Sequence, residues 1–303
     1  MPNLHDQIRE NKTKSILLIV IVLALVIGAV AAYSYAVRRD FTLPIIAAVL
    51  AIPSSLIGYY SGDKIALAVN RAKELPREAA PELHNIIENL AITAGVPKPK
   101  VYFIDSPALN AFATGRDPAH ASIAVTRGLV ENLSRTELEG VLAHELSHVK
   151  NYDIRFATLV AIFIGFIVIL SDLFLRATFS PLRPSGYAGQ GGSRNREGGN
   201  IGAILAVVGL VLLIVSPIIA KLIQLAISRQ REYLADSSGA LLTRYPEGLA
   251  SALEKIAHGS AMPQAGHATA HLFIANPFRG RQLATLFATH PPIEERVKRL
   301  RGM

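Results

Sequence analysis

Residues 142–149 carry two histidines and a glutamate in the pattern H-E-x-x-H. In a helix with about 3.6 residues per turn, positions four apart share one face, so His144 and His148 can both reach one cation. Glu145 lies beside them, where its carboxylate can take a proton from water at an open coordination position. The pattern therefore predicts a zinc site with a built-in general base.

A zinc site of this kind needs a third protein ligand and an open position for water. Residue 154 is Ile, which excludes the extended motif with a third histidine six residues after His148. The best candidate is Glu232, because its segment has a helical pattern that puts Glu232 and Asp236 on one face. The competing carboxylates, which point away from the histidine face or lie too close to it in sequence, are Asp153 and Glu139.

The composition sets the environment of this site. Half of the 303 residues are hydrophobic, 18% are charged and the mean hydropathy is +0.34. Soluble chains carry about a quarter charged residues, so this balance favours a membrane protein. A bilayer crossing needs about 20 apolar residues, and four segments approach or exceed that length. The predicted spans, paired as two hairpins, are Ser15–Val37, Thr42–Tyr60, Phe156–Leu175 and Ile201–Ala220.

These spans divide the chain into four predicted parts. They are an N-terminal transmembrane hairpin (1–61), a first catalytic part with the H-E-x-x-H helix (62–155), a second transmembrane hairpin with a flexible Gly-, Ser- and Pro-rich loop at 180–200 (156–220), and a second catalytic part with the third ligand (221–303). An even number of crossings separates the two catalytic parts, so they share one side. Basic residues flanking the first hairpin favour the cytoplasmic side.

The absence of cysteine and the dispersed positive charge limit the ligands and partners that this chain can use. The chain has no cysteine, which excludes a disulfide framework and a thiolate zinc cluster, so a metal must be held by histidine and carboxylate. The net charge of +8 is dispersed and lacks a nucleic-acid motif. We therefore expect one Zn²⁺ per chain, contact with a lipid bilayer and no nucleic-acid partner; no motif specifies an oligomeric state.

The polar parts mix helix and strand. Apolar spacing predicts a helix over 79–94, and short apolar runs predict buried strands over 101–104 and 122–126. Ser134 and Glu137 have the spacing of a capping box, so Ser134 should begin the helix that carries the motif. The predicted fold class is α+β and mainly helical.

Four segments together resemble the HtpX family of membrane zinc metalloproteases. They are N-A-F-A-T-G at 110–115, the motif region 140–153, the R-x-x-E-Y-x-A-D frame around Glu232 and T-H-P-P-I-E-E-R at 289–296. The resemblance covers nearly the whole chain. It implies a gluzincin-type protease domain attached to four transmembrane helices, and proteolysis of misfolded or damaged membrane proteins in stress-related quality control. It also implies a multi-pass protein of the cell (inner) membrane whose catalytic domain faces the cytoplasm.

The resemblance also implies roles for individual residues. Glu145 would be the catalytic acid and base, Asp236 would orient a ligand imidazole, and His290 would lie near the zinc with Arg296 associated. The implied zinc ligands are His144, His148 and Glu232. The implied edge strand, on which the backbone of a substrate pairs, consists of Asn110, Ala111, Phe112, Ala113 and Thr114.

Functions of a different class are a zinc transporter and a catalytically silent zinc-binding membrane scaffold. A transporter needs ionisable groups within its spans, and only Asp172 qualifies. A silent scaffold would keep the ligands and lose Glu145, which is present. The expected function is therefore that of a zinc metalloendopeptidase acting on unfolded or membrane proteins.

Overall fold

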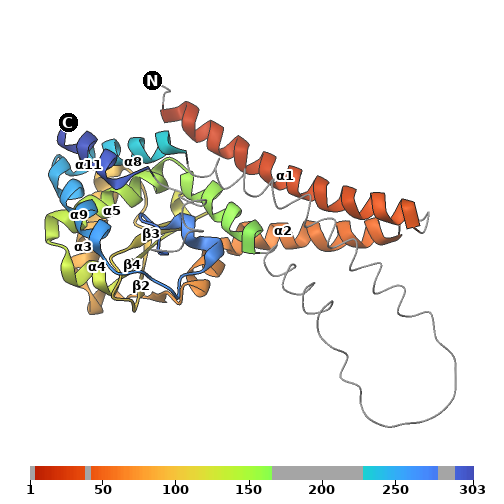
Figure 1. Ribbon diagram of the computed structural model, residues 1–303, viewed down its shortest axis with the longest axis horizontal. Helices are drawn as coiled ribbons and strands as arrows, with labels where there is room; N and C mark the ends of the chain where they lie inside the picture. Colours follow the sequence, from red (N-terminus) through yellow and green to blue (C-terminus); the bar gives the residue numbers. More distant parts are fainter. Residues whose placement is uncertain (1–3, 38–41, 166–227, 279–290) are drawn as a thin grey trace, which may run out of the picture.

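A computed structural model describes residues 4–37, 42–165, 228–278 and 291–303 (Figure 1). These residues form a mainly helical α+β unit from which two long helices project. His290, the loop at 180–200 and the span predicted over 201–220 lie outside the described residues, as do the last residues of the span predicted over 156–175.

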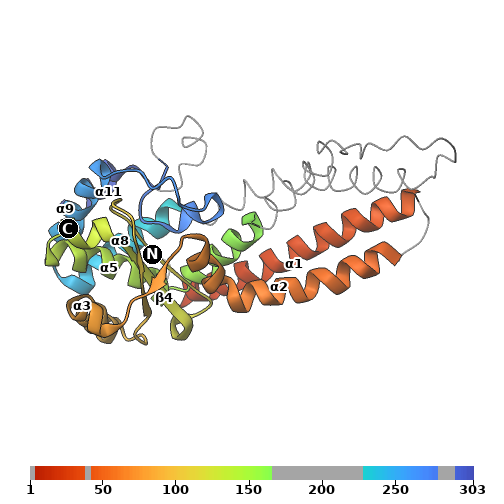
Figure 2. The same ribbon diagram turned by 90° about the horizontal axis from the view of Figure 1, so that it is seen from below.

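The two projecting helices are α1 (Leu4–Val37) and α2 (Thr42–Val69), which lie side by side in both views (Figures 1 and 2). Their ranges contain the first two predicted spans, and α2 continues through Pro53. No helix in the described part of the chain combines the length and apolar character that crossing a bilayer requires. The helical structure of these two segments is confirmed, and their insertion in a bilayer stays a prediction.

The folded unit also contains a four-stranded sheet. Its strands are β1 (Lys73–Glu74), β2 (Lys100–Ile104), β3 (Ala111–Gly115) and β4 (Ala121–Thr126), in the spatial order β1-β2-β4-β3. β2 and β4 run parallel, whereas β1 and β3 are each antiparallel to their neighbour. The two predicted strands are confirmed, and β3 lies last in the order, which makes it an edge strand.

Helix α5 (Arg135–Lys150) carries the H-E-x-x-H motif and lies at the centre of the unit. It packs against α3 (Pro81–Ala94), α8 (Arg229–Thr243), α9 (Pro246–His258) and β3. Apolar residues of all these elements form one core, in which Leu142 is fully buried. The remaining elements are α4 (Arg127–Asn132), α11 (Ile293–Arg301) and the 3₁₀ helices Arg77–Ala79, Pro118–His120 and His267–Leu272, and the chain is helical again over 153–165.

Two glycines let the neighbouring helices approach α5 closely. A Cβ atom on Gly140 would lie 2.6 Å from the backbone nitrogen of Leu249 in α9. A Cβ atom on Gly239 of α8 would lie 3.0 Å from the backbone nitrogen of His144. The second contact sets the distance between α8 and the histidine-bearing face of α5.

The start of α5 is fixed by the predicted capping box, which is confirmed. The Ser134 side chain accepts a hydrogen bond from the Glu137 backbone, and the Glu137 carboxylate accepts one from the Ser134 backbone at 2.7 Å. The same carboxylate accepts hydrogen bonds from Ser251 at 2.6 Å and Lys255 at 2.7 Å, both on α9. Burial alone would raise the pKa of Glu137, but the bonds from Lys255, Ser251 and Ser134 outweigh it and lower the pKa to about 2.

Replacing Glu137 by glutamine should therefore destabilise the fold. We expect the free energy of unfolding to fall by about 1–2 kcal/mol, since the cap and the link to α9 are both weakened. Thermal unfolding of the full chain measures the change. The folded pKa of about 2 lies below the ordinary value of 4.5, so the wild-type advantage should be complete above about pH 4.5 and disappear as the pH falls toward 2.

The matched control is Glu139→Gln on the same helix. The Glu139 carboxylate is partly exposed and bridges Arg135 at 3.1 Å, and exposed pairs of this kind contribute less than about 1 kcal/mol. An equal loss of unfolding free energy in both variants would show that the contacts of Glu137 with α9 stabilise the fold no more than an exposed ion pair does.

Candidate active site

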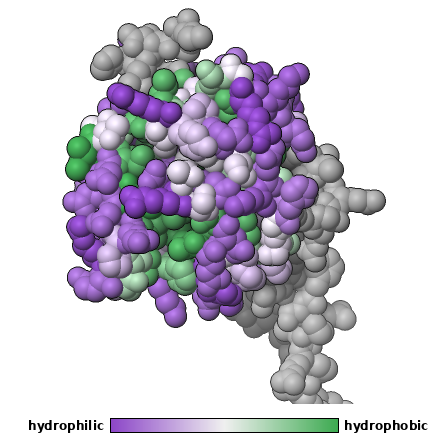
Figure 3. Space-filling view, turned by 90° about the vertical axis from the view of Figure 1, so that its left-hand side faces the viewer, coloured by the Kyte–Doolittle hydropathy of each residue, from purple (hydrophilic) through white to green (hydrophobic). Residues whose placement is uncertain are grey.

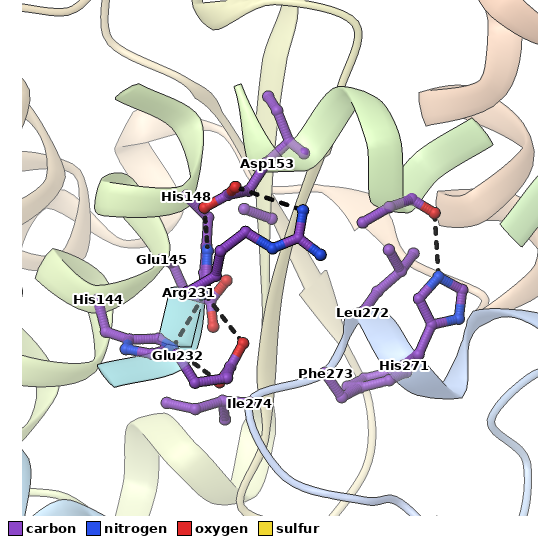
Figure 4. Close-up of a pocket in the computed structure, with 13 residues that line it drawn as sticks. His144, Glu145, His148, Asp153, Arg231, Glu232, His271, Leu272, Phe273 and Ile274 are labelled. Atoms are coloured by element: carbon purple, nitrogen blue, oxygen red, sulfur yellow. Dashed lines mark hydrogen bonds and ion pairs between the residues drawn. The ribbon is translucent and has the colours of Figure 1, made fainter. Parts of the chain in front are cut away.

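Three side chains from α5 and α8 converge in the part of the chain that the structure describes. His144 and His148 project from one face of α5, and Glu232 projects from the first turn of α8 (Figure 4). One ligand atom from each lies within 4.8 Å of the other two. Residues separated by more than 80 positions in the sequence are thus brought together, as the sequence predicts.

The spacing of these atoms fits a zinc ion. Nε2 of His144 lies 3.2 Å from Nε2 of His148, and the two nitrogens lie 3.9 and 3.6 Å from the Glu232 carboxylate. Zinc binds imidazole and carboxylate at about 2.0–2.2 Å with tetrahedral geometry, which separates neighbouring ligand atoms by roughly 3.3–3.5 Å. The three donors therefore need only small adjustments to share one ion.

Each imidazole has a carboxylate next to its Nδ1 atom, on the side away from the other ligands. Nδ1 of His144 is 3.0 Å from Asp236, the residue predicted for this role, and Nδ1 of His148 is 3.0 Å from Asp153. Such partners hold the proton on Nδ1 and leave the lone pair on Nε2 for a metal. From the sequence Asp153 is predicted only as a competing ligand, and its contact with His148 is not predicted. The position of Asp153, five residues after His148, is the feature of the sequence that could have indicated this contact.

The two Nε2 atoms therefore face each other with a carboxylate beside them. With both Nδ1 atoms donating to carboxylates, only a cation can occupy the space between the Nε2 atoms. In the metal-free protein we expect that cation to be a proton shared by the two imidazoles. Burial would lower the pKa of His148, but the Asp153 hydrogen bond and the Glu232 charge outweigh it and raise the pKa to about 9. Burial lowers the pKa of His144 to about 4, so this imidazole accepts the shared proton.

Zinc must displace this proton. We expect zinc binding at pH 7 to release about one proton from His148, plus a fraction of one from Glu145. Because the raised pKa of His148 lies above neutrality, the apparent zinc affinity should fall by about tenfold for each pH unit between 9 and 7. Calorimetric titration of the metal-free full chain in buffers of different ionisation enthalpy counts the protons. Zinc binding without proton release would contradict the protonated pair.

Arg296 of α11 completes the polar core of the site. Its side chain is completely buried and donates two hydrogen bonds to the Asp236 carboxylate, at 2.9 and 2.7 Å. Its Nη1 atom also lies 3.8 Å from the Glu232 carboxylate. Burial would lower the pKa of Arg296, but Asp236 outweighs it and raises the pKa, so the guanidinium stays charged. Arg296 thus offsets part of the negative charge of Glu232 and Asp236.

Glu145 lies on the side of the site that faces the sheet. Its carboxylate is almost completely buried and lies near the backbone of Ala113 in β3, which lines the same pocket. Burial raises the pKa of Glu145 to about 7, with the negative charge of Glu232 adding to the shift. A carboxylate with a pKa near neutrality can both accept and return a proton, which a general acid and base must do.

The space beside these residues is small. It measures about 40 Å³ and is roofed by Leu272, Phe273 and Ile274 (Figure 4). A water molecule needs about 10–15 Å³ in such a cavity, so the space has room for an ion and a few waters.

The roof also occupies part of the predicted substrate strand. Phe112 of β3 forms a β-bridge with Phe273, and the backbone N–H of Ile274 donates to the carbonyl of Ala111 at 3.0 Å. The Asn110 side chain donates to the carbonyl of Ala275 at 2.8 Å. The outer edge of β3 is therefore paired with the chain's own segment 273–275, which the sequence analysis did not anticipate.

This chain is similar to known proteins over most of its length. The sequence model of peptidase family M48 matches residues 77–303. A "Protease HtpX homolog" of Caldanaerobacter subterraneus subsp. tengcongensis is 47% identical over 302 residues, covering 99% of this chain and 98% of the relative. Another of Dictyoglomus turgidum is 43% identical, covering 99% and 94%. Among solved structures, the crystal structure of S. mikatae Ste24p matches with a TM-score of 0.49 and 21% identity, over 96% of this chain and 65% of that chain.

Proposed function

Because the chain belongs to peptidase family M48, within which its relatives are HtpX proteases, we propose that this metallopeptidase is a membrane-integrated zinc endopeptidase. Its substrates would be misfolded or damaged membrane proteins, in stress-related quality control. The observation that carries the zinc proposal is the pair of Nε2 atoms, which face each other at 3.2 Å beside the Glu232 carboxylate.

In the proposed mechanism His144, His148 and Glu232 hold one zinc ion. When bound, zinc supplies a positive centre that polarises a peptide carbonyl and lowers the pKa of water. Glu145 accepts a proton from the attacking water and passes it to the leaving amine. Asp236 and Asp153 hold the two imidazoles with Nε2 toward the ion, at the 3.0 Å contacts described above.

The substrate backbone would pair with the edge strand formed by Asn110, Ala111, Phe112, Ala113 and Thr114. Pairing of this kind reads an extended backbone more than side-chain identity, which favours unfolded segments. It requires that segment 273–275 leave the edge, because the bridge from Phe112 to Phe273 occupies the same backbone groups. His290 would then donate a hydrogen bond to the developing oxyanion, with Arg296 nearby.

We assign the described helices α1 and α2 to the N-terminal membrane hairpin (1–61), and we keep the boundaries 62–155, 156–220 and 221–303 for the other parts. Apolar side chains exposed on these helices support contact with lipid; they include Ile16, Leu17, Val20, Ile45, Val49, Ile52, Leu56 and Ile57. The end of the folded unit that faces the viewer in Figure 3 is mostly hydrophilic, which supports its exposure to water. The basic residues that flank the first hairpin support the cytoplasmic side.

Removal of the metal tests this function. Dialysis of the purified full chain against a chelator should abolish cleavage of an unstructured reporter polypeptide, and added zinc should restore it. Mass spectrometry of the products and measurement of the bound metal follow the two properties separately. Cleavage that persists without metal would overturn the zinc endopeptidase.

The second candidate is a catalytically silent zinc-binding scaffold. The pairing of segment 273–275 with the outer edge of β3 favours it, because that edge is then occupied and cannot pair with a substrate strand. A chain that binds zinc but cleaves neither unfolded nor membrane proteins would support this candidate.

A further inference from the structure

One residue of the N-terminal helix reaches the candidate active site. Asn11 lies on α1, more than 130 positions before the metal-binding histidines, and only 4% of its surface is exposed. Its side-chain amide nitrogen donates to the carbonyl of Asn151 at 2.9 Å and to the Asp153 carboxylate at 2.7 Å. Both protons of the amide are therefore used on the turn that follows α5.

The other end of the same amide contacts α8. The Asn11 carbonyl oxygen accepts a hydrogen bond from Nη1 of Arg231 at 3.3 Å. Arg231 also lies 3.9 Å from Asp153 and directly precedes Glu232. Asn11 thus joins the two segments that supply the candidate metal ligands, one through Asp153 and one through Arg231.

The path from Asn11 to the site is short. One oxygen of Asp153 accepts from Asn11, and the other accepts from Nδ1 of His148 at 3.0 Å. The carboxylate is thereby held at both oxygens, which fixes its plane and so the direction of the imidazole. Partners behind a metal ligand orient it, and their loss typically weakens metal binding by about 10–100-fold.

Neighbouring residues hold α1 against this turn. The Lys12 ammonium lies 4.4 Å from the centre of the Tyr152 ring, a cation–π contact. Tyr152 has a φ of 61°, in the left-handed region that bulky residues avoid, so this backbone conformation needs support from its surroundings. The contact of α1 with the turn 151–153 supplies such support.

We propose that Asn11 is a positioning residue through which α1 holds Asp153, and hence His148, in the geometry that binds the metal. This inference rests on the proposed function, since it assumes that His148 is a zinc ligand. It also makes the N-terminal helix a part of the catalytic apparatus, in addition to its proposed role in the membrane.

The test compares zinc affinity in full-length variants purified in detergent, measured by competition with a chromophoric chelator. Asn11→Ala should bind zinc about tenfold more weakly. Asn11→Leu keeps the approximate shape and removes every hydrogen bond, and it should be weakened similarly. Thr13→Ala is the matched control, because the Thr13 hydroxyl is exposed and, among the described residues, bonds only to the Arg9 carbonyl of α1, at 2.9 Å. The zinc affinity of this variant should not change.

A double-mutant cycle with Asp153→Asn separates positioning from general destabilisation. If Asn11 acts through Asp153, adding Asn11→Leu to Asp153→Asn should cost much less affinity than it costs in the wild type. The visible spectrum of the cobalt-substituted protein should shift in Asn11→Leu and stay unchanged in Thr13→Ala, because it reports the ligand geometry and not the stability of the fold.

The outcomes are distinct. Wild-type affinity in Asn11→Leu would overturn the inference, even if Asn11→Ala failed to fold, because packing alone would then suffice. Additive losses in the cycle would also overturn it. If the wild type bound no zinc, the proposed function itself would fail, and the inference with it.

Discussion

Replacing Glu145 by glutamine is expected to reduce peptide cleavage by about a hundredfold to ten-thousandfold while the zinc content stays near one per chain. General acid–base catalysis typically contributes about 10²–10⁴ to the rate, and a glutamine amide can neither accept nor return the proton. Glu145 is not among the three converging donors, so the metal site should persist. Initial rates on an unstructured reporter polypeptide, together with metal analysis of the same preparation, measure both properties.

The pH dependence of the wild type should report the same carboxylate. Burial raises the pKa of Glu145 to about 7 in the metal-free protein, and the positive charge of bound zinc will move it downward. Since the base must be deprotonated, kcat/KM should fall as the pH drops below the pKa that Glu145 has in the zinc-bound protein. The residual activity of Glu145→Gln should lack this acidic limb.

Glu139→Gln is the appropriate control for the catalytic variant. It makes the same chemical change on the same helix, at a partly exposed side chain that bridges Arg135. Activity near that of the wild type is expected. A Glu145→Gln protein that still cleaved would remove Glu145 from the mechanism, and zinc loss in that variant would give the residue a structural role instead.

Local patterns were sufficient to predict the elements that present the site. The capping box at Ser134 correctly located the start of α5, and the spacing of His144 and His148 put them on one face. Glu232 could be predicted because a helix puts it on the same face as Asp236, four residues later. These signals lie within a few residues of one another, where helix geometry alone determines which side chains meet.

The contacts that depend on tertiary packing were missed. Asn11 meets Asp153 only because α1 crosses the turn after α5, and no local pattern in either segment specifies that contact. The bridge from Phe112 to Phe273 depends in the same way on a long-range approach. β1 consists of two exposed residues, so it has no apolar alternation from which a strand could be predicted.

Replacing Glu232 by alanine should remove zinc as well as activity. The change deletes one of the three donors and leaves two imidazoles from one helix, so zinc affinity should fall by at least about a hundredfold, more than for loss of a partner behind a ligand. The fold should persist, because Arg296 keeps both hydrogen bonds to Asp236. Chelator competition on the full chain, with thermal unfolding of the metal-free form, distinguishes lost metal from lost structure.

Glu232→Asp gives a graded comparison, because it keeps the carboxylate but shortens its reach by one methylene. Its zinc affinity should fall between those of the wild type and Glu232→Ala. The pKa of His148 should also fall in metal-free Glu232→Ala, since the Glu232 charge helps to raise it. The imidazole resonances of the metal-free protein would follow that shift by NMR. Zinc retained at wild-type affinity in Glu232→Ala would remove α8 from the metal site and would require another donor beside the two histidines of α5.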